Sequence, residues 1–364
     1  MSPMRYSQSE PVIQNGHAAT NGIKGKPGLR RNSSIIPLVP TTHKEDVPLV
    51  FREPHINGGF RQVDQPWHYY FLSIFQVHNE VMNVWTHLIA AIVMISKIWK
   101  YSHEVDFVND AYTWPFLAGL ICGSLLYVCS SGAHCFQSKS ELVHYVAFMV
   151  DYAGIGLYGL GSVIVHYQYC SEDSLYELLK NVYLPVGCLL GFCICLCCTI
   201  SKIYYTRPYP FTRKMWQMTP VGCIYIWLNM PIVHKVYNCY MYEHGCGESF
   251  TYHIHQILWF LASAIFFASS YPQKFNPGMC DFIGHSHQLF HICIMICTSI
   301  QMDGVFLDMQ QDREHLIKRG IPTFMDAFGP VILVVGLEIL NIAIFQKIAK
   351  DKIAKESKSN VKFE

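Results

Sequence analysis

Eight long apolar segments set the narrowest limit on how this 364-residue chain can fold. At a rise of about 1.5 Å per residue, each is long enough to cross a hydrocarbon layer about 30 Å thick. Backbone polar groups in lipid must pair within the segment, so a span of this length has to be helical. The sequence therefore predicts an all-α, polytopic membrane bundle with eight transmembrane helices. They cover residues 82–101, 111–134, 144–167, 178–203, 218–238, 251–271, 286–305 and 325–347.

The composition supports a membrane protein. The chain is 51% hydrophobic and only 15% charged, whereas soluble domains carry about 25% charged residues. Its net charge of +1 gives no basic face, which excludes a nucleic-acid partner. Most of the 15 cysteines lie in apolar segments and act there as small buried side chains. Cys170, Cys239 and Cys246 fall on the predicted outer side, where both a disulfide and free thiols remain open.

The two ends of the chain differ from its middle. Residues 1–50 are rich in Gly, Pro, Ser, Thr and Asn, so we expect a disordered cytosolic tail before a bundle over residues 51–348. Residues 349–364 form a basic tail. Lys and Arg are concentrated in the predicted cytosolic loops, whereas the predicted outer loops carry fewer of them together with many Asp and Glu residues. Both termini are therefore expected in the cytosol.

Polar side chains interrupt three of the apolar segments. Ser130 and His134 lie near the end of the second segment, Asp151 lies in the third, and His287 and His291 lie at the start of the seventh. Such residues are costly in lipid and therefore need a partner or a function. Each pair spaced four apart shares one face of a helix. With the N-terminus inside, all five residues fall at a similar depth near the cytosolic surface.

Three neutral imidazoles with one open position are the ligands of a catalytic zinc site. The sequence therefore predicts Zn²⁺ bound by His134, His287 and His291. Against this stands a simpler interpretation, because a membrane histidine is usually a hydrogen-bonded packing residue and the chain has 18 histidines. His285 is set aside because it lies off the face that His287 shares with His291.

Other buried polar residues leave alternatives open. Glu80, Asn83 and His87 follow helical spacing at the start of the first span, where they could face the zinc cavity or fix the start of the helix by capping. Capping is the preferred interpretation. Glu338 is the acid in the apolar run of the eighth span, and because an unpaired charge is costly there, we expect it to face the bundle or to be protonated.

Several strings of residues combine into a specific pattern. Ser130 to His134, followed by Asp151, the string from Ser286 to His291, and the segment from His78 to Leu88 together resemble the progestin and adipoQ receptor family. The resemblance covers about residues 50–345. The eighth span fits the membrane progestin receptor branch better than the seven-span adiponectin receptors, and implies a seven-span core plus a C-terminal eighth helix. Further strings closest to that branch are Phe51-Arg52-Glu53-Pro54-His55-Ile56, Gly59-Phe60-Arg61 and Gln137-Ser138-Lys139-Ser140-Glu141.

The resemblance implies roles for the polar residues. It assigns the zinc ligands to His134, His287 and His291, the carboxylate that holds water to Asp151, and a serine one turn before the first ligand to Ser130. The same constellation resembles alkaline ceramidases. In that chemistry zinc lowers the pKa of water to about 7, Asp151 orients the water and accepts its proton, and Ser130 donates to the developing oxyanion. A structural zinc that clamps the spans together is equally open.

Two classes of function follow from the resemblance. The first is a plasma-membrane receptor for a progestin-like steroid or another lipid, which reaches the receptor from the bilayer. A cytosolic partner then transmits the signal. A heterotrimeric G protein is the partner that the resemblance suggests. The alternative is a zinc-dependent lipid amide hydrolase acting on ceramide-like lipids, so whether the chain is an enzyme stays open at this point.

Overall fold

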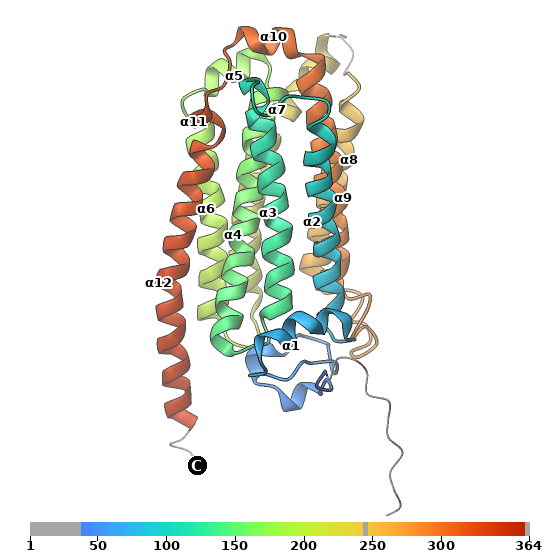
Figure 1. The fold of residues 1–364 in the computed structure, drawn as a ribbon, viewed down its shortest axis with the longest axis vertical. Coiled ribbons are helices and arrows are strands. Elements are labelled where there is room, and N and C mark those ends of the chain that lie inside the picture. The colour runs from blue at the N-terminus through green and yellow to red at the C-terminus, as the bar shows by residue number, and fades with distance from the viewer. Residues whose placement is uncertain (1–37, 243–246, 361–364) are drawn as a thin grey trace, which may run out of the picture. The chain divides into compact units, whose positions relative to one another are not determined.

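The computed structural model describes residues 38–242 and 247–360, with side chains up to residue 358. Helices dominate these residues, and a single β-bridge joins Thr42 to Phe60. The long helices are α2 (Val81–Tyr101), α3 (Trp114–Phe136), α4 (Glu141–Val165), α6 (Tyr183–Tyr204), α7 (Phe211–Tyr242), α8 (Phe250–Ser269), α9 (Ser286–Gln311) and α12 (Gly329–Asn360) (Figure 1). Short helices are α1 (Trp67–Leu72), α5 (Asp173–Leu179), α10 (Arg313–Lys318) and α11 (Phe324–Ala327), and a π-helical turn, His166–Cys170, extends α4.

Seven helices in the described part of the chain are long and apolar enough to cross a membrane, namely α2, α3, α4 with its π-turn, α6, α8, α9 and α12. The predicted all-α, polytopic fold is therefore confirmed. Helix α7 is long but less apolar, because Arg213 and Lys214 open it and His234 and Lys235 lie near its end. The fifth predicted span, and with it the count of eight, remains a prediction, as does the cytosolic location of the termini.

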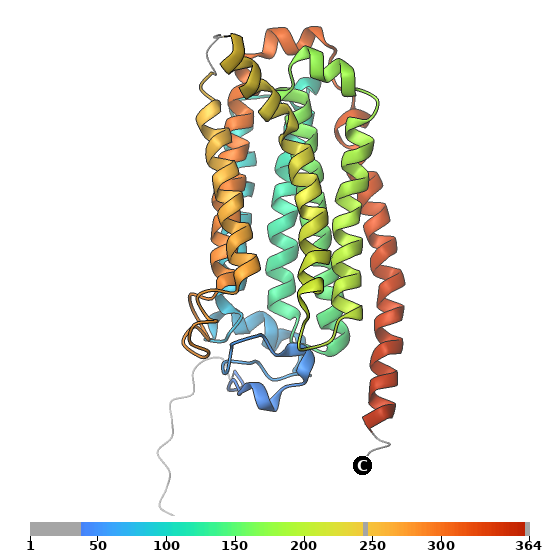
Figure 2. The ribbon, with the colours of Figure 1, turned by 180° about the vertical axis from the view of Figure 1, so that it is seen from behind.

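The long helices form a closed ring of neighbours. Successive pairs from α2 to α7 pack side by side, α8 packs on α9, and α9 returns to contact α2 and α3. Both views show these helices running along one common direction (Figures 1 and 2). Helix α12 lies outside the ring against α4 and α6. Because α9 closes the ring, residues near the start of α9 meet residues near the end of α3.

Helices α4 and α6 approach each other closely at two glycines. A Cβ on Gly156 would lie 2.5 Å from the carbonyl oxygen of Gly191 and 2.7 Å from Glu338 Oε1. Small residues permit this approach of backbones, which is how helices without a hydrophobic driving force pack in lipid. The contact also places Glu338 of α12 against the α4–α6 interface with its side chain buried, so this residue faces the bundle as predicted.

The folded part extends beyond both predicted boundaries. Of the predicted tail, residues 1–37 lie outside the described residues, but residues 38–50 are folded, with 3₁₀ turns at Lys44–Asp46 and Leu49–Phe51. Val47 and Phe51 pack there against Ile56 and Phe60. At the other end, α12 continues to Asn360 rather than stopping near residue 348.

The three cysteines predicted on the outer side differ from one another. Cys170 is a free, buried thiol, and Cys239 is disulfide-bonded. Cys246 lies outside the described residues. A disulfide involving Cys170, one of the alternatives that the sequence left open, is therefore not formed.

Candidate metal centre

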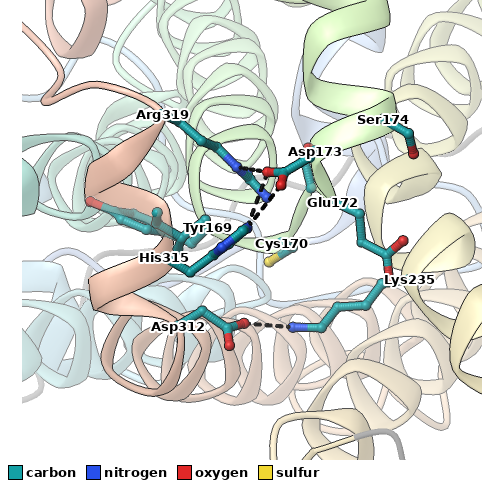
Figure 3. Close-up of a pocket in the computed structure, with 11 residues that line it drawn as sticks. Tyr169, Cys170, Glu172, Asp173, Ser174, Lys235, Asp312, His315 and Arg319 are labelled. Carbon is teal, nitrogen blue, oxygen red and sulfur yellow. Dashed lines mark hydrogen bonds and ion pairs between the residues drawn. The ribbon is translucent and has the colours of Figure 1, made fainter. Parts of the chain in front are cut away.

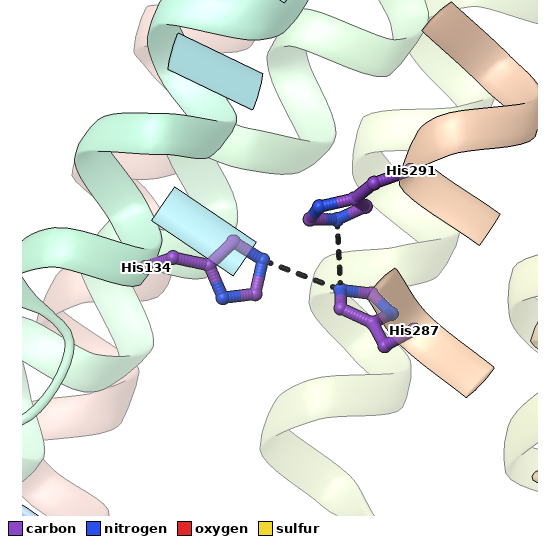
Figure 4. A group of neighbouring side chains, drawn as sticks. All are labelled: His134, His287 and His291. Atoms are coloured by element: carbon purple, nitrogen blue, oxygen red, sulfur yellow. Dashed lines mark hydrogen bonds between the residues drawn. The ribbon is translucent and has the colours of Figure 1, made fainter. Parts of the chain in front are cut away.

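Three histidine rings meet between α3 and α9 (Figure 4). His287 Nε2 lies 3.2 Å from His134 Nε2 and 3.1 Å from His291 Nε2. His134 and His291 are buried and His287 is half-buried. The structure thus brings together the three residues that the sequence singled out as ligands, and it turns the same ring nitrogen of each toward one point.

Residues of α2 and its first turn fix two of these rings. His134 Nδ1 donates to Glu80 Oε2 at 2.8 Å, and the same oxygen accepts from Asn83 Nδ2 at 2.7 Å. His291 Nδ1 lies 3.0 Å from Thr86 Oγ1, whose own proton goes to the Met82 carbonyl at 2.7 Å. The Thr86 hydroxyl therefore accepts from His291. Both rings carry their proton on Nδ1 and present an unprotonated Nε2 to the centre.

The three nitrogens cannot satisfy one another by hydrogen bonds alone. His134 and His291 each offer a lone pair at Nε2, and a proton on His287 Nε2 can be given to only one of them. A cation at the meeting point would accept all three lone pairs. Tetrahedral zinc with nitrogen ligands at about 2.0–2.1 Å places those nitrogens about 3.3 Å apart, close to the separations of 3.2 and 3.1 Å. The residues fit a zinc ion.

Unpaired polar groups surround this centre. The His87 ring stacks on His291 with centroids 3.5 Å apart, and among the described residues neither of its nitrogens has a hydrogen-bond partner. Ser130 Oγ is buried beside the Asp151 carboxylate, and among the described residues it has no hydrogen bond of full geometry. Asp151 is buried on α4 near Ser130 and His134, outside the group of three histidines. Buried unpaired groups of this kind are usually satisfied by water or a ligand.

The sequence favoured a capping role for Glu80, and the structure shows a different one. It stands at the start of α2, but its side chain makes no capping hydrogen bond and instead contacts His134. Burial by itself would raise the pKa of Glu80, but the hydrogen bonds from His134 and Asn83 hold that pKa well below its usual range. Glu80 is therefore an anionic partner of His134. His87 likewise faces the centre rather than the helix terminus.

Sequence reasoning missed Thr86 entirely. A signal was present, because Glu80, Asn83 and His87 already marked one face of α2, and Thr86 lies one turn beyond Asn83. The threonine by itself does not indicate a role, because a Thr hydroxyl in a membrane helix usually hydrogen-bonds to a backbone carbonyl of the same helix. Thr86 does bond Met82, and it accepts from His291 as well.

A buried arginine anchors the helix end that carries His134. Arg61 Nη2 donates to the His134 carbonyl at 2.7 Å, and Nη1 donates to the Cys135 carbonyl at 2.6 Å and to Ser73 Oγ at 2.9 Å. The last carbonyls of a helix lack intrahelical partners, so a guanidinium there both satisfies them and opposes the negative end of the helix dipole. The folded N-terminal segment thereby positions His134.

The start of α9 is held in a similar way. The Ser286 amide donates to Gln273 Oε1 at 2.7 Å, and Gln273 Nε2 returns a bond to Ser286 Oγ at 2.8 Å. Gln288 Oε1 accepts from the Gly284 amide at 2.6 Å, and its Nε2 donates to the Phe282 carbonyl at 2.9 Å. These four bonds fix the turn on which His287 stands.

Comparisons of the sequence with known proteins identify the family of the chain. A sequence profile of the family described as haemolysin-III related matches residues 75–302, a stretch that contains the three histidines and Asp151. The chain belongs to the haemolysin-III-related family. This assignment and the relatives below confirm the predicted membership of the progestin and adipoQ receptors.

Relatives of this haemolysin-III-related chain are similar over most of their length. It is 41% identical to membrane progestin receptor beta of Mus musculus over 302 residues, which cover 81% of this chain and 84% of the relative. It is 39% identical to membrane progestin receptor alpha-B of Danio rerio over 288 residues, covering 78% and 81%. Membrane progestin receptor alpha of Homo sapiens is 32% identical over 322 residues, covering 87% and 91%. These relatives and the apolar helices support a multi-pass protein of the plasma membrane.

Proposed function

We propose that this chain is a membrane receptor for a progestin-like steroid and that it binds one Zn²⁺ at the three-histidine centre. The receptor class is supported by relatives of similar length whose names are membrane progestin receptors. The zinc is supported by a single observation, the convergence of the Nε2 atoms of His134, His287 and His291. In two of these rings, His134 and His291, the proton is held at Nδ1 by Glu80 and Thr86.

The residues divide the work at this centre. His134, His287 and His291 would hold the ion, while Glu80 and Thr86 orient two of the rings. The bound ion would join the end of α3 to the start of α9, two helices that are distant in sequence but close the ring. A steroid that favours one packing of the ring would then be linked to the state of this junction.

Two measurements on the purified chain in lipid nanodiscs test the proposal. Zinc content per chain is expected to fall by one when His287→Ala and His291→Ala are combined, and to stay unchanged in the matched control His68→Ala with His103→Ala, because these two histidines are exposed. Tritiated progesterone is expected to bind saturably to the wild-type chain. Equal zinc content in both double variants would contradict the metal centre, and purely non-saturable binding would contradict the steroid.

We propose that the receptor signals through a heterotrimeric G protein. In a purified mixture of receptor, G protein and labelled GTP analogue, progesterone should accelerate nucleotide exchange only when the receptor is present. Exchange at the same rate with and without progesterone would count against this partner.

The second candidate is the zinc-dependent lipid amide hydrolase. It is favoured by the buried Asp151 carboxylate lying near both His134 and the buried hydroxyl of Ser130. A bound zinc ion would supply Lewis acidity and a nucleophile derived from water at neutral pH. Asp151 would hold the water and take its proton, and Ser130 Oγ would donate to the carbonyl oxygen as charge develops there.

Hydrolysis is tested by fatty-acid release from a ceramide substrate in mixed micelles. Under this hypothesis Asp151→Asn should abolish release and Ser130→Ala should reduce it about a hundredfold, while both variants keep their zinc. If the zinc-loaded wild-type chain releases no fatty acid, the hydrolase is excluded and the receptor with a structural zinc remains.

A further inference from the structure

A second group of metal-binding side chains lies at the end of the bundle opposite the three histidines. Cys170 Sγ lies 3.2 Å from Asp308 Oδ2, and His253 Nε2 lies 2.7 Å from the same oxygen. One donor atom from each residue falls within 4.8 Å of the other two, and all three side chains are buried. They come from the π-turn after α4, from α8 and from α9, so the fold assembles them from distant parts of the sequence.

The Asp308 carboxylate divides its two oxygens between different partners. Oδ1 accepts from Lys235 Nζ at 2.8 Å and from Ser249 Oγ at 2.5 Å, whereas Oδ2 faces the thiol of Cys170 and the ring of His253. His253 Nδ1 lies 3.0 Å from the amide group of Gln256. Asp308 and His253 are thus each held by a hydrogen bond on the side that faces away from the group. Because Gln256 Nε2 donates to His253 Nδ1, the ring proton lies on Nε2 and is given to Asp308; a metal ion at Nε2 requires that proton on Nδ1 and the Gln256 amide turned so that its oxygen accepts it.

Two cavities lead to this group from the same end of the molecule. One, of about 410 Å³, is lined by Cys170, Lys235 and Asp312 among others, and Figure 3 shows Cys170 deep between the surrounding polar side chains. The other, of about 350 Å³, is lined by His253, Lys235 and Asp312. Cys170 lines the first cavity and His253 the second, so the buried group borders spaces large enough for a hydrated ion.

The charges around the group also favour a cation. Lys235 is shared between Asp308 and Asp312, which lies 3.4 Å from Nζ. With Cys170 protonated and uncharged, the side chains of Lys235, Asp308 and Asp312 together carry one net negative charge. A divalent cation that displaces the thiol proton to water leaves the group neutral, because the ion adds two positive charges and the thiolate adds one negative charge.

We propose that Cys170, His253 and Asp308 form a second metal site, selective for a thiophilic divalent cation such as Zn²⁺. Sulfur, imidazole nitrogen and carboxylate oxygen are all ligands that zinc accepts, with a fourth position left for water. The donors need to separate by about half an ångström to reach tetrahedral spacing around zinc. Asp308 lies 17 residues beyond His291 on α9, a distance of about 26 Å, so the two sites are distinct.

The two sites can be told apart because only the second contains sulfur. Co²⁺ bound to a thiolate gives a sulfur-to-metal charge-transfer band in the near ultraviolet, which a site of three histidines cannot give. We expect this band when the purified full-length chain in nanodiscs is titrated with Co²⁺ alone. The band should persist in His287→Ala and vanish in Cys170→Ser. It should remain in Cys122→Ser, the matched control, because Cys122 is an equally buried free thiol in α3.

Zinc content gives an independent count. Equilibration with Zn²⁺ followed by desalting should leave two ions per wild-type chain, one in Cys170→Ser and one in His287→Ala. Asp308→Asn is a poorer variant because it leaves Lys235 without its buried partner, so Cys170→Ser, which keeps a donor to Asp308, is the one to use. Failure of the three-histidine centre would change only the His287→Ala comparison, and failure of the second site only the Cys170→Ser comparison. The proposal is overturned if monodisperse wild-type chain gives no charge-transfer band, or if Cys122→Ser loses the band as well.

Discussion

Glu80 accepts a hydrogen bond from His134 Nδ1 at 2.8 Å across the boundary between α2 and α3. The bond fixes both the tautomer and the rotation of the ring, so Nε2 points at the two histidines of α9. Carboxylates in this position raise the basicity of a ligand histidine and reduce the freedom that it loses on binding metal. Glu80 is thus the residue on which the geometry of the candidate centre depends most directly, although it is not a ligand.

Replacing Glu80 by alanine is expected to weaken zinc binding at the three-histidine centre by about 10- to 100-fold. The measurement is competition with a chromophoric chelator, in a Cys170→Ser background so that only this centre is observed. Glu141→Ala is the matched control, because Glu141 is the first residue of α4 and forms no hydrogen bond or ion pair with a histidine in the described part of the chain. Equal affinities of the two variants would show that Glu80 does not support the ligand.

Thr86 allows a finer comparison, because two substitutions separate shape from hydrogen bonding. Thr86→Val keeps the shape but removes the oxygen that accepts from His291 Nδ1, so zinc affinity should fall about tenfold. Thr86→Ser keeps the oxygen and should retain most of the affinity. The same chelator competition measures both variants. A loss in Thr86→Ser as large as that in Thr86→Val would mean that packing, rather than the hydrogen bond, is what matters.

Zinc should also stabilise the folded bundle. An ion that binds only the folded chain adds about 2.7 kcal/mol at about 100 times its Kd. Thermal unfolding in nanodiscs, followed by circular dichroism with and without added Zn²⁺, should therefore show a higher midpoint with the metal. In a Cys170→Ser background the shift should disappear in His134→Ala. A shift that survives His134→Ala would locate the stabilising ion elsewhere.

The fold was predictable from the sequence because lipid leaves so few alternatives. A long uncharged run must be helical, and the alternation of inside and outside then places the end of α3 and the start of α9 at the same depth. Within α9 the spacing of His287 and His291 puts both on one face. Helix length, alternation and spacing predict a common depth for His134, His287 and His291 without any knowledge of packing. That α3 and α9 are also neighbours is decided by the packing of α9 against α2 and α3.

Contacts that depend on helix rotation were not predictable. The start of α2 can turn Glu80 toward solvent as a cap or inward toward His134, and only the packing of α2 against α3 decides between the two. The group at Cys170 and Asp308 was equally unpredictable, because Cys170 lies in a π-turn that the pattern of apolar residues does not indicate. The same holds for residues 38–50, whose small apolar cluster is too short to stand out by hydropathy.

An ion pair between α2 and α9 offers a test of how the ring is closed. Lys97 Nζ lies 2.5 Å from Asp303 Oδ1, and the Tyr101 hydroxyl donates to the same oxygen. Asp303→Asn leaves the Lys97 ammonium largely buried without its counter-charge. We expect a loss of about 2 kcal/mol, less than the roughly 3–5 kcal/mol of a fully buried pair, because Asp303 is only partly covered by protein.

The double variant Lys97→Met with Asp303→Leu separates charge from packing in this ion pair. Because it removes both charges and keeps apolar contact, it should recover most of the stability lost in Asp303→Asn. Unfolding by SDS in mixed micelles gives the comparison. If the double variant is less stable than Asp303→Asn, the ion pair contributes more than its burial costs, and our interpretation of the α2–α9 contact is wrong.

The opposite result is expected at Glu338, because its buried side chain has no charged partner among the described residues. In the described residues Oε1 forms no hydrogen bond, and it lies where α12 meets Gly156 of α4. Glu338→Gln keeps the shape and removes the possibility of a charge, so stability should be unchanged or slightly higher. Glu338→Lys places an obligatory cation in the same apolar contact and should cost roughly 3 kcal/mol.

Limited proteolysis of α12 in nanodiscs reports directly on whether this helix stays docked. Because α12 packs on the ring mainly through α4 and α6, a charge at the contact should release it before the rest of the bundle unfolds. Cleavage near the end of α12 should therefore accelerate in Glu338→Lys and remain slow in Glu338→Gln. Ile339→Lys is the matched control, because that side chain points away from the ring and is exposed, so its cost should come from lipid alone and leave the docking intact. Equal cleavage of both lysine variants would mean that Glu338 does not lie at the contact that holds α12.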